Sequence, residues 1–300
     1  MMRKIWLFGV VLATVTLSGC FYHGPCLNGS GPVLSEQREV GEFTGVNNTG
    51  SFDLYVTMAD SYGVEVVAQE NLIPIIETYV SGNTLIVETD GNSCYRSNSP
   101  VQVYVSMPEA EALTLTGSGR VFADMAASTE VEISNSGSGY MEIDSVMSEA
   151  FVLDNSGSGY ISIIASYVND VDVIQSGSGA ILCGTLFGAS EMDIRHSSSG
   201  RISAVLINGV VMDVVMSGSG KVELTGDVEV AEYSLNSSGG IDALNLEVSD
   251  VDAINTGSGN IYVWANDLLD ANITGSGDII YRGDPAITSR ITGSGKLRSY

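Results

Sequence analysis

The chain has 300 residues, of which 36 are acidic and only 12 are Lys or Arg, so its formal net charge at pH 7 is −24. A surface with this charge repels the phosphates of nucleic acids and anionic lipid headgroups, which excludes DNA-binding and RNA-binding functions. The four cysteines form no CxxC pair, which argues against a zinc or redox site, and the composition indicates no cofactor.

The first 19 residues have the order of a secretory signal peptide. The basic pair Arg3 and Lys4 precedes an apolar run over residues 5–15, which is about half of the ~20 residues that span a bilayer. The sequence Leu17-Ser18-Gly19-Cys20 then resembles a bacterial lipobox, which implies cleavage before Cys20 and a lipid on that cysteine. An ordinary secretory signal with an accidental cysteine is the alternative. We therefore expect the membrane to be a partner through a lipid anchor at Cys20.

The residues after Cys20 indicate a destination and a tether. Phe21 stands in place of the aspartate that resembles an inner-membrane retention signal, which favours the outer membrane of a Gram-negative cell envelope. Residues 20–38 are rich in Gly and Pro without periodicity, so we expect a tether between the membrane and the fold. In an oxidising envelope Cys26 and Cys94 could pair, whereas Cys183 lies in an apolar strand and is interpreted as a core residue.

Residues 39–112 are predicted to form a smaller β-rich N-terminal part. Four segments rich in β-branched and aromatic residues are bounded by Gly, Asn, Asp or Pro, which is typical of strands. They are Phe52–Thr57, Gly63–Ala68, Thr84–Thr89 and Val101–Met107. The segment Asn71–Val80 is either the only helix or another strand.

Residues 113–300 repeat one motif about every 20 residues. Gly-Ser-Gly begins at residues 117, 137, 157, 177, 218, 257, 275 and 293, and degenerate copies occur at Ser198-Ser199-Gly200 and Ser237-Ser238-Gly239. Apolar residues stand two and four positions after the last glycine, and six and eight positions before it. This alternation indicates strands with one buried face, two for each repeat, joined by a Gly-Ser-Gly corner.

The repeats could form a meander of antiparallel hairpins or a solenoid of stacked coils, and we favour the solenoid. In a solenoid, equivalent residues stack about 4.8 Å apart, so like residues should recur in columns. The central serine recurs in all ten units, and a polar column includes Asn135, Asn155, Gln175 and Asn255. We expect these side chains to hydrogen-bond along the axis and the glycines to supply the backbone angles of a tight corner. The predicted fold is all-β, a parallel β-solenoid of about ten coils.

Several segments resemble one known family. They are Phe43-Thr44-Gly45-Val46, residues 50–56, Glu70-Asn71-Leu72-Ile73-Pro74, residues 103–108 and, near the end, residues 275–279, 281–285 and 293–295. The chain is similar in these segments to the bacterial family called putative auto-transporter adhesin, head GIN domain, over about residues 39–300. The resemblance implies an exported β-helical protein, often a lipoprotein, and the family name implies adhesion.

The sequence offers no residue that we assign to catalysis. The mature chain has two histidines. His23 lies in the tether, and His196 takes a corner position where other units place Asn or Gln, so it is interpreted as structural. The Gly-Ser-Gly units lack the Gly-x-Ser-x-Gly pattern of a nucleophile elbow. The glycine corners also do not begin helices, so they are not predicted to bind phosphate.

One outward-facing position carries acidic residues in seven of eight successive units. We call these seven residues the acidic ladder: Glu132, Asp172, Asp193, Asp213, Glu232, Asp252 and Asp270. Stacked carboxylates would repel by about 1 kcal/mol per neighbouring pair in water. The ladder is therefore either a device for solubility or a face that binds divalent cations such as calcium. Through such cations, or beside the aromatic residues Tyr140, Tyr160 and Tyr262, the face could bind a glycan.

Two functional hypotheses follow from these patterns. The first is a non-catalytic, lipid-anchored protein of the cell envelope with an adhesin-like or scaffold role, binding a glycan or a surface protein. The second is a carbohydrate-active enzyme, a polysaccharide lyase or hydrolase, because such enzymes also use acidic faces on β-helices. Evenly spread acids and scarce bases favour the first hypothesis.

Overall fold

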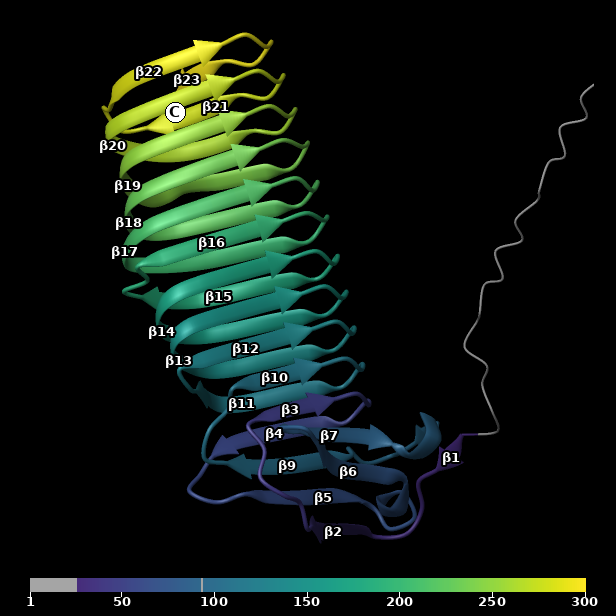
Figure 1. The fold of residues 1–300 in the computed structure, drawn as a ribbon. Helices are drawn as coiled ribbons and strands as arrows, with labels where there is room; N and C mark the ends of the chain where they lie inside the picture. The colour runs from purple at the N-terminus through teal and green to yellow at the C-terminus, as the bar shows by residue number, and fades with distance from the viewer. Residues whose placement is uncertain (1–25, 93) are drawn as a thin grey trace, which may run out of the picture.

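The computed structural model describes residues 26–92 and 94–300, and it is a long β-rod with a smaller β-rich part at its N-terminal end (Figure 1). Cys20 and His23 lie outside the described residues. The rod is a solenoid of about nine turns. The N-terminal part contains β1 (Leu27–Asn28), β2 (Val33–Arg38), β3 (Gly45–Asn48), β4 (Asp53–Met58), β5 (Gly63–Gln69), β6 (Ile76–Ser81), β7 (Thr84–Thr89), β8 (Tyr95–Arg96) and β9 (Gln102–Met107), with 3-10 turns at Ile73–Ile75 and Asp90–Asn92. The rod contains β10 (Ala112–Leu115), β11 (Arg120–Ala127), β12 (Glu130–Asn135), β13 (Tyr140–Asn155), β14 (Tyr160–Gln175), β15 (Ala180–Phe187), β16 (Glu191–His196), β17 (Arg201–Met216), β18 (Lys221–Leu235), β19 (Gly240–Asn255), β20 (Ile261–Ile273), β21 (Ile279–Arg282), β22 (Ala286–Ile291) and β23 (Leu297–Ser299).

The N-terminal part closes one end of the rod. Strands β3 and β4 pair in parallel with β10 and β11, so they form a first coil beneath the repeats. On their other edge, β3 pairs in parallel with β7 and β4 with β9. The next strands run antiparallel, with β6 beside β7 and β5 between β9 and β2. The antiparallel strands β5 and β6 end the parallel stack, because a further coil could not continue the parallel pairing along their edges.

Two segments of the N-terminal part differ from the sequence predictions. Residues 71–80 hold a short 3-10 turn and then strand β6, so the helical alternative is wrong and the strand alternative is confirmed over residues 76–80. Residues 33–38, expected to be tether, form β2 and pair with β5 from Val33 to Arg38. The Gly and Pro residues around β2 concealed this strand, since five of its six residues are exposed and give no buried alternation.

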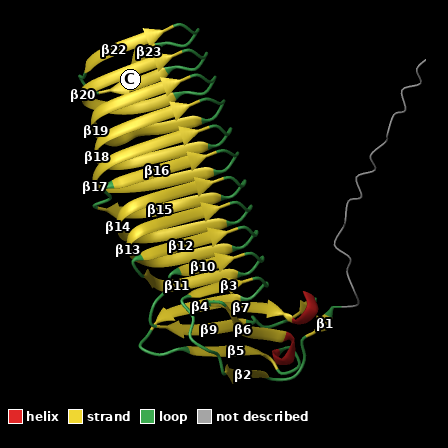
Figure 2. Ribbon diagram, viewed as in Figure 1, coloured by secondary structure: helices red, strands yellow, loops and turns green. Residues whose placement is uncertain are grey.

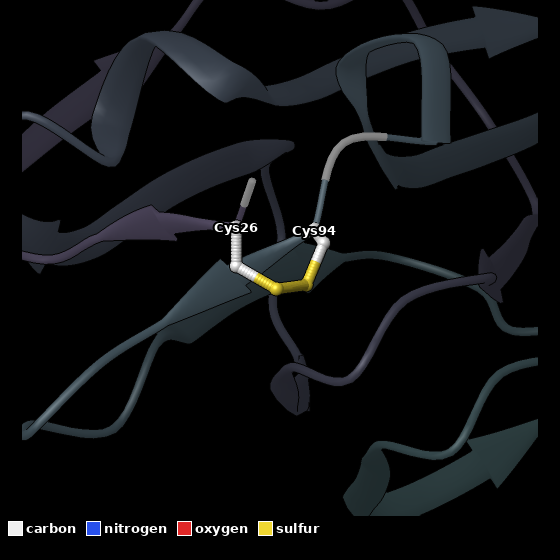
Figure 3. The surroundings of a disulfide bond; sticks show 2 residues. All are labelled: Cys26 and Cys94. Atoms are coloured by element: carbon white, nitrogen blue, oxygen red, sulfur yellow. A yellow bond between two sulfur atoms is a disulfide. The ribbon is translucent and has the colours of Figure 1, made fainter. Parts of the chain in front are cut away.

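The cysteine pairing that the sequence left possible is present. Cys26 and Cys94 form a disulfide with a Cα–Cα distance of 4.5 Å (Figure 3). Next to it, β1 pairs in parallel with β8 as a separate two-stranded sheet. The disulfide therefore ties the leading segment to the loop that follows β7. Cys183 is a buried free cysteine of the core, as predicted.

The rod is a parallel stack and not a meander. Tyr140 pairs with Tyr160 and Asn155 with Gln175, so each residue of β13 lies beside its equivalent one repeat later. Parallel pairing continues through β20, with register shifts inside the coils, and the residues that flank the corners stay paired with their equivalents. The corners between coils line up along one edge of the rod, as Figure 2 shows in green. The predicted parallel solenoid is therefore confirmed.

The core lies inside the coils and follows the predicted alternation. In β14, Ile161, Ile163, Val171 and Val173 are at most 3% exposed. Between them the buried positions change phase twice, from 163 to 166 and from 168 to 171. Each change turns the chain, because it moves the next buried side chain from one face of the strand to the other. A coil thus has several short outer faces around a single apolar interior.

The corner glycines are required by close packing and not by unusual backbone angles, which corrects our prediction. Among the described residues, the glycines with positive φ are Gly31, Gly82, Gly91, Gly188, Gly226 and Gly283, and none belongs to a Gly-Ser-Gly corner. A Cβ on Gly157 would lie 2.0 Å from the carbonyl oxygen of Gly137 in the preceding coil. Stacked corners bring backbone directly onto backbone, so a side chain has no room.

The polar column hydrogen-bonds mainly within each corner. Asn155 is fully buried, and its Nδ2 donates to the carbonyl oxygen of Gly159 at 3.1 Å. His196 is 1% exposed, and its Nε2 lies 2.9 Å from the carbonyl oxygen of Gly200, so its predicted structural role holds. The central serines are exposed along the corner edge. A serine–serine hydrogen bond along the axis joins Ser178 Oγ to Ser158 Oγ at 3.2 Å.

Candidate functional site

The acidic ladder is a continuous column on the outer surface. Asp172 pairs with Asp193, Asp193 with Asp213, Asp213 with Glu232, and Glu232 with Asp252. Asp252 in turn pairs with Asp270, while Glu132 is separated from Asp172 by Val152. The sequence therefore placed these residues in the correct column, because the repeat period equals the coil length.

Repulsion along the acidic ladder is relieved at one place by an arginine. Arg195 projects between two rungs, and its guanidinium contacts Asp172 Oδ1 and Asp193 Oδ2, each at 2.7 Å. Beyond it, burial raises the pKa of Asp213, the charge of Asp193 raises it further, and Arg195 opposes the rise. Burial and then Asp213 and Asp252 raise the pKa of Glu232. The ladder is thus a strip of like charges that partly destabilise one another.

The acidic ladder does not assemble into a metal centre. Over residues 26–92 and 94–300, no group of three or more His, Cys, Asp or Glu side chains is arranged to hold a metal ion. Successive rungs each present one carboxylate per coil, about 4.8 Å apart, whereas calcium needs six to eight oxygen ligands at one point. The charge of this face favours its interpretation as a solubility strip.

A second surface lies on the other side of the corners, and we call it the corner groove. It is a depression of about 970 Å³. One wall consists of the Ser-Gly pairs of six corners, and the other consists of the first residues of the six strands that follow those corners, with Leu182 beside them. Those first residues are Arg120, Tyr140, Tyr160, Ala180, Arg201 and Lys221, and they form one column in register. The groove therefore runs along the rod axis.

Aromatic rings line the N-terminal half of the corner groove. The rings of Tyr140 and Tyr160 are stacked, with centroids 5.5 Å apart. Phe122 meets Tyr140 edge-on at 6.2 Å and itself stacks on Tyr55. Burial and a hydrogen bond to Glu142 raise the pKa of Tyr140 to about 12, so its hydroxyl stays protonated and donates to Glu142 Oε2. The stack fixes the orientation of these rings on an otherwise polar surface.

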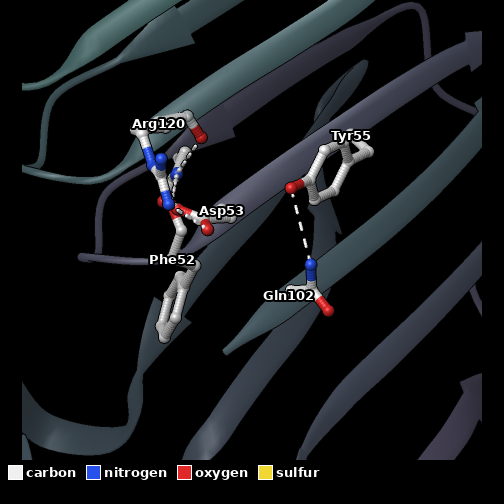
Figure 4. Close-up of polar contacts among 6 residues, drawn as sticks. Phe52, Asp53, Tyr55, Gln102 and Arg120 are labelled. Atoms are coloured by element: carbon white, nitrogen blue, oxygen red, sulfur yellow. Dashed lines mark hydrogen bonds and ion pairs between the residues drawn. The ribbon is translucent and has the colours of Figure 1, made fainter. Parts of the chain in front are cut away.

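Each cation of the corner groove has an acidic partner. Arg120 Nε donates to Asp53 Oδ1 at 2.7 Å and its terminal nitrogen to Asp53 Oδ2 at 2.5 Å (Figure 4). Asp53 is 7% exposed, so this two-pronged pair also joins the first coil to the repeats. Lys221 lies 2.6 Å from Glu223 and 3.3 Å from Asp242.

Arg201 completes the row of cations. Its guanidinium lies 3.6 Å from Glu223, which belongs to the following coil. Asp53, Glu223 and Asp242 stand beside the three cations, and Glu142 beside Tyr140 is a fourth acid. The corner groove is therefore close to electrically neutral, with one negative charge in excess, although the protein carries a charge of −24.

Sequence reasoning found only part of this surface. It named Tyr140, Tyr160 and Tyr262 as aromatics that could accompany a glycan, but attached them to the acidic ladder. The structure places Tyr140 and Tyr160 in the corner groove, on the opposite side of the corners from the ladder. Tyr262 stands two positions further along its coil and pairs with Asp242 and Ile280. The sequence pattern that indicates the groove is the residue directly after the last glycine of each corner. The alternation of buried residues does not include this position.

None of the helices over residues 26–92 and 94–300 is long and apolar enough to cross a bilayer.

Comparisons with known proteins bear on the family and the fold. Residues 42–204 and 182–285 match the family model described as "Putative auto-transporter adhesin, head GIN domain". A crystal structure called "putative lipid binding protein" from Parabacteroides distasonis is 25% identical with a TM-score of 0.50, and the match covers 92% of this chain and 100% of that one. A "putative adhesin" from Parabacteroides merdae is 18% identical with a TM-score of 0.55 at the same coverage of both chains. A search of curated proteins finds no match.

Proposed function

The chain belongs to the family described as "Putative auto-transporter adhesin, head GIN domain", and on that premise we propose that it is a non-catalytic adhesin of the cell envelope. In this proposal a lipid on Cys20 holds the rod at the outer membrane, and the corner groove binds a glycan or a surface protein. The observation that carries the proposal is the groove itself: one concave, nearly neutral strip lined by stacked tyrosines on a strongly acidic rod.

The chemistry of the corner groove supports binding more than catalysis. Its lining contains serine, tyrosine, arginine and lysine side chains, and the carboxylates beside it, Asp53, Glu142, Glu223 and Asp242, are each paired with one of these tyrosine, arginine or lysine side chains. Such pairing engages the groups that could otherwise act as a general acid or base. The acids of the ladder are spread one per coil on another face. Glycan-binding surfaces typically combine aromatic faces with hydroxyl and charged hydrogen-bonding groups, and this groove supplies both.

The binding proposal is tested with the detergent-solubilised full chain on an array of glycans and envelope proteins. Lipid vesicles are included because the similar protein from P. distasonis is called a lipid binding protein. We expect at least one glycan or surface protein to be retained, and retention to fall in a Tyr140→Ala variant. The matched control is Tyr167→Ala, which removes a ring stacked on Phe187 outside the groove. Equal retention by both variants, or no retention at all, would contradict the proposal.

Two further measurements address anchoring and catalysis. A Cys20→Ser variant is expected to leave the membrane fraction of the producing cell. Recovery of that variant in the membrane would contradict anchoring by Cys20. Incubation of the purified protein with the polysaccharides of the array is expected to leave their lengths unchanged, and depolymerisation by the protein would establish the enzyme hypothesis instead.

A further inference from the structure

The column of strand-first residues in the corner groove has a gap at one coil. Tyr160 pairs with Ala180, and Ala180 pairs with Arg201. One face of the Tyr160 ring is covered by Tyr140, at a centroid distance of 5.5 Å. The next coil offers only the methyl group of Ala180 in the same column, so no ring continues the stack on the other face of Tyr160.

The far wall of this gap is the guanidinium of Arg201. It contacts Glu223 at 3.6 Å, and Glu223 lies one coil further toward the C-terminal end. Glu223 thereby holds the guanidinium clear of the space over Ala180, while Arg201 still lines the groove at the next coil. The gap thus has an aromatic wall on one side, a planar cation on the other, and the Ala180 methyl as its floor, with Leu182 beside it.

The dimension of the gap suits one six-membered sugar ring. Two coil steps separate Tyr160 from Arg201, which amounts to about 9.6 Å along the axis. A ring seated between two walls needs one van der Waals contact of about 4 Å on each side. The gap therefore leaves space for a puckered ring between the walls.

The groups around the gap match a sugar chemically. The apolar face of a pyranose packs on an aromatic ring, and its hydroxyls need donors and acceptors at the rim. The exposed hydroxyls of Ser158, Ser178 and Ser199 lie on the corner side of the groove. Arg201 provides further N–H donors in a fixed plane.

Charge decides which sugars fit. The nearby cations already contact Asp53, Glu223 and Asp242, so they offer little unpaired positive charge. An acidic sugar would also meet the repulsion of a chain with net charge −24. A cationic ligand would be attracted to the acidic ladder on the opposite side of the corners. These considerations leave a neutral sugar as the best match for the gap.

We propose that the gap at Ala180 is a subsite for one neutral pyranose unit of a glycan, stacked on Tyr160 and hydrogen-bonded by Arg201 and the corner serines. This subsite rests on the proposed function, which it makes more specific by naming the sugar class and the position. The proposal is directly testable, because a larger side chain at Ala180 should fill the gap and prevent binding while it removes no contact that stabilises the fold.

The test uses calorimetric titration of the detergent-solubilised full chain with hexasaccharides of glucose, mannose and galactose, and with hexagalacturonate as the acidic counterpart. The variants are Ala180→Phe, which fills the gap by extending the ring stack, and Tyr160→Ala, which removes the platform. Tyr167→Ala is the matched control, because its ring stacks on Phe187 at 4.9 Å outside the groove. Thermal melting of each variant establishes that it is folded.

We expect the protein to bind at least one neutral hexasaccharide, and both groove variants to weaken that binding at least tenfold while Tyr167→Ala leaves it unchanged. Unchanged binding in a folded Ala180→Phe variant would overturn the subsite, and so would binding of the acidic hexasaccharide alone. In either case the proposed function survives if Tyr140→Ala still lowers retention on the array, because that loss assigns the ligand to the groove. Absence of every ligand on the array and in the titrations would overturn both.

Discussion

The replacement of one corner glycine by alanine tests how the coils are held together. In Gly157→Ala the new Cβ would lie 2.0 Å from the Gly137 carbonyl oxygen and 2.7 Å from the Ser136 carbonyl carbon. These are backbone atoms, so no side-chain rotation can relieve the overlap. The corner must move away from the preceding coil.

The cost can be worked out from the contacts that the corner would lose. The amides of Gly157, Ser158 and Gly159 donate to carbonyl oxygens of the preceding coil at 3.1 Å each. Each such hydrogen bond contributes about 1 kcal/mol net, and overpacking itself costs about 1–3 kcal/mol. We therefore expect Gly157→Ala to lower the free energy of unfolding by about 4–6 kcal/mol.

The assay is urea unfolding followed by far-UV circular dichroism, with Gly82→Ala as the control. Gly82 has a φ of +62°, and a Cβ there would meet nothing within 4 Å. Alanine at Gly82 pays only for its backbone conformation, about 1–2 kcal/mol. If Gly157→Ala destabilises the protein no more than Gly82→Ala, close stacking of the corners is not what selects glycine there.

Three further predictions concern stability. Glu232→Gln removes a carboxylate whose pKa is raised in the folded state. Because the folded wild type binds this proton more tightly than the unfolded chain, its stability should rise as the pH falls from 7 through the raised pKa toward about 4. The variant should be more stable than the wild type by less than about 1 kcal/mol at pH 7, and its thermal melts should depend less on pH. Asn155→Ala removes a buried side-chain donor to the Gly159 and Ala180 carbonyls, although the Ala180 amide still donates to the Gly159 oxygen. Urea unfolding should therefore show a loss of about 1–2 kcal/mol, and a loss below that of an exposed Ser158→Ala control would contradict the role of the polar column. Replacing Cys26 and Cys94 by serine removes a cross-link between residues 68 positions apart in the sequence. The free energy of unfolding should fall by up to about 4 kcal/mol in the same assay. An unchanged unfolding midpoint would show that other contacts hold this segment in place.

The solenoid could be predicted from the sequence because each coil corresponds to one sequence repeat of about 20 residues. In a parallel in-register stack, residues one repeat apart become neighbours, so a column in the structure corresponds to a residue type that recurs at the same position of successive repeats. This is why Asp172, Asp193 and Asp213 could be assigned to one column, and why His196 could be recognised as a substitute for the corner asparagine. The possible pairing of Cys26 and Cys94 was suggested by the oxidising compartment.

The N-terminal part was predicted less completely because it does not repeat. Strand β2 is nearly all exposed and lies between Gly and Pro residues, and β6 follows a 3-10 turn at Pro74. The antiparallel partner of β2 is β5, which is distant along the chain, so no local pattern specified β2, whereas β6 forms a hairpin with the adjacent strand β7. Contacts between distant segments override weak local preferences in such elements.

The amino-acid sequence by itself determined the coil length, the buried columns and the acidic ladder, since each depends on order and spacing along the chain. Only the tertiary structure decided that the corner glycines are selected by backbone contact, that the central serines are exposed, and that Tyr160, Ala180 and Arg201 surround a gap. The sequence repeat indicates which residues are neighbours along the rod axis. The free space between them depends on the conformation of each side chain and on the residues with which it forms ion pairs or hydrogen bonds.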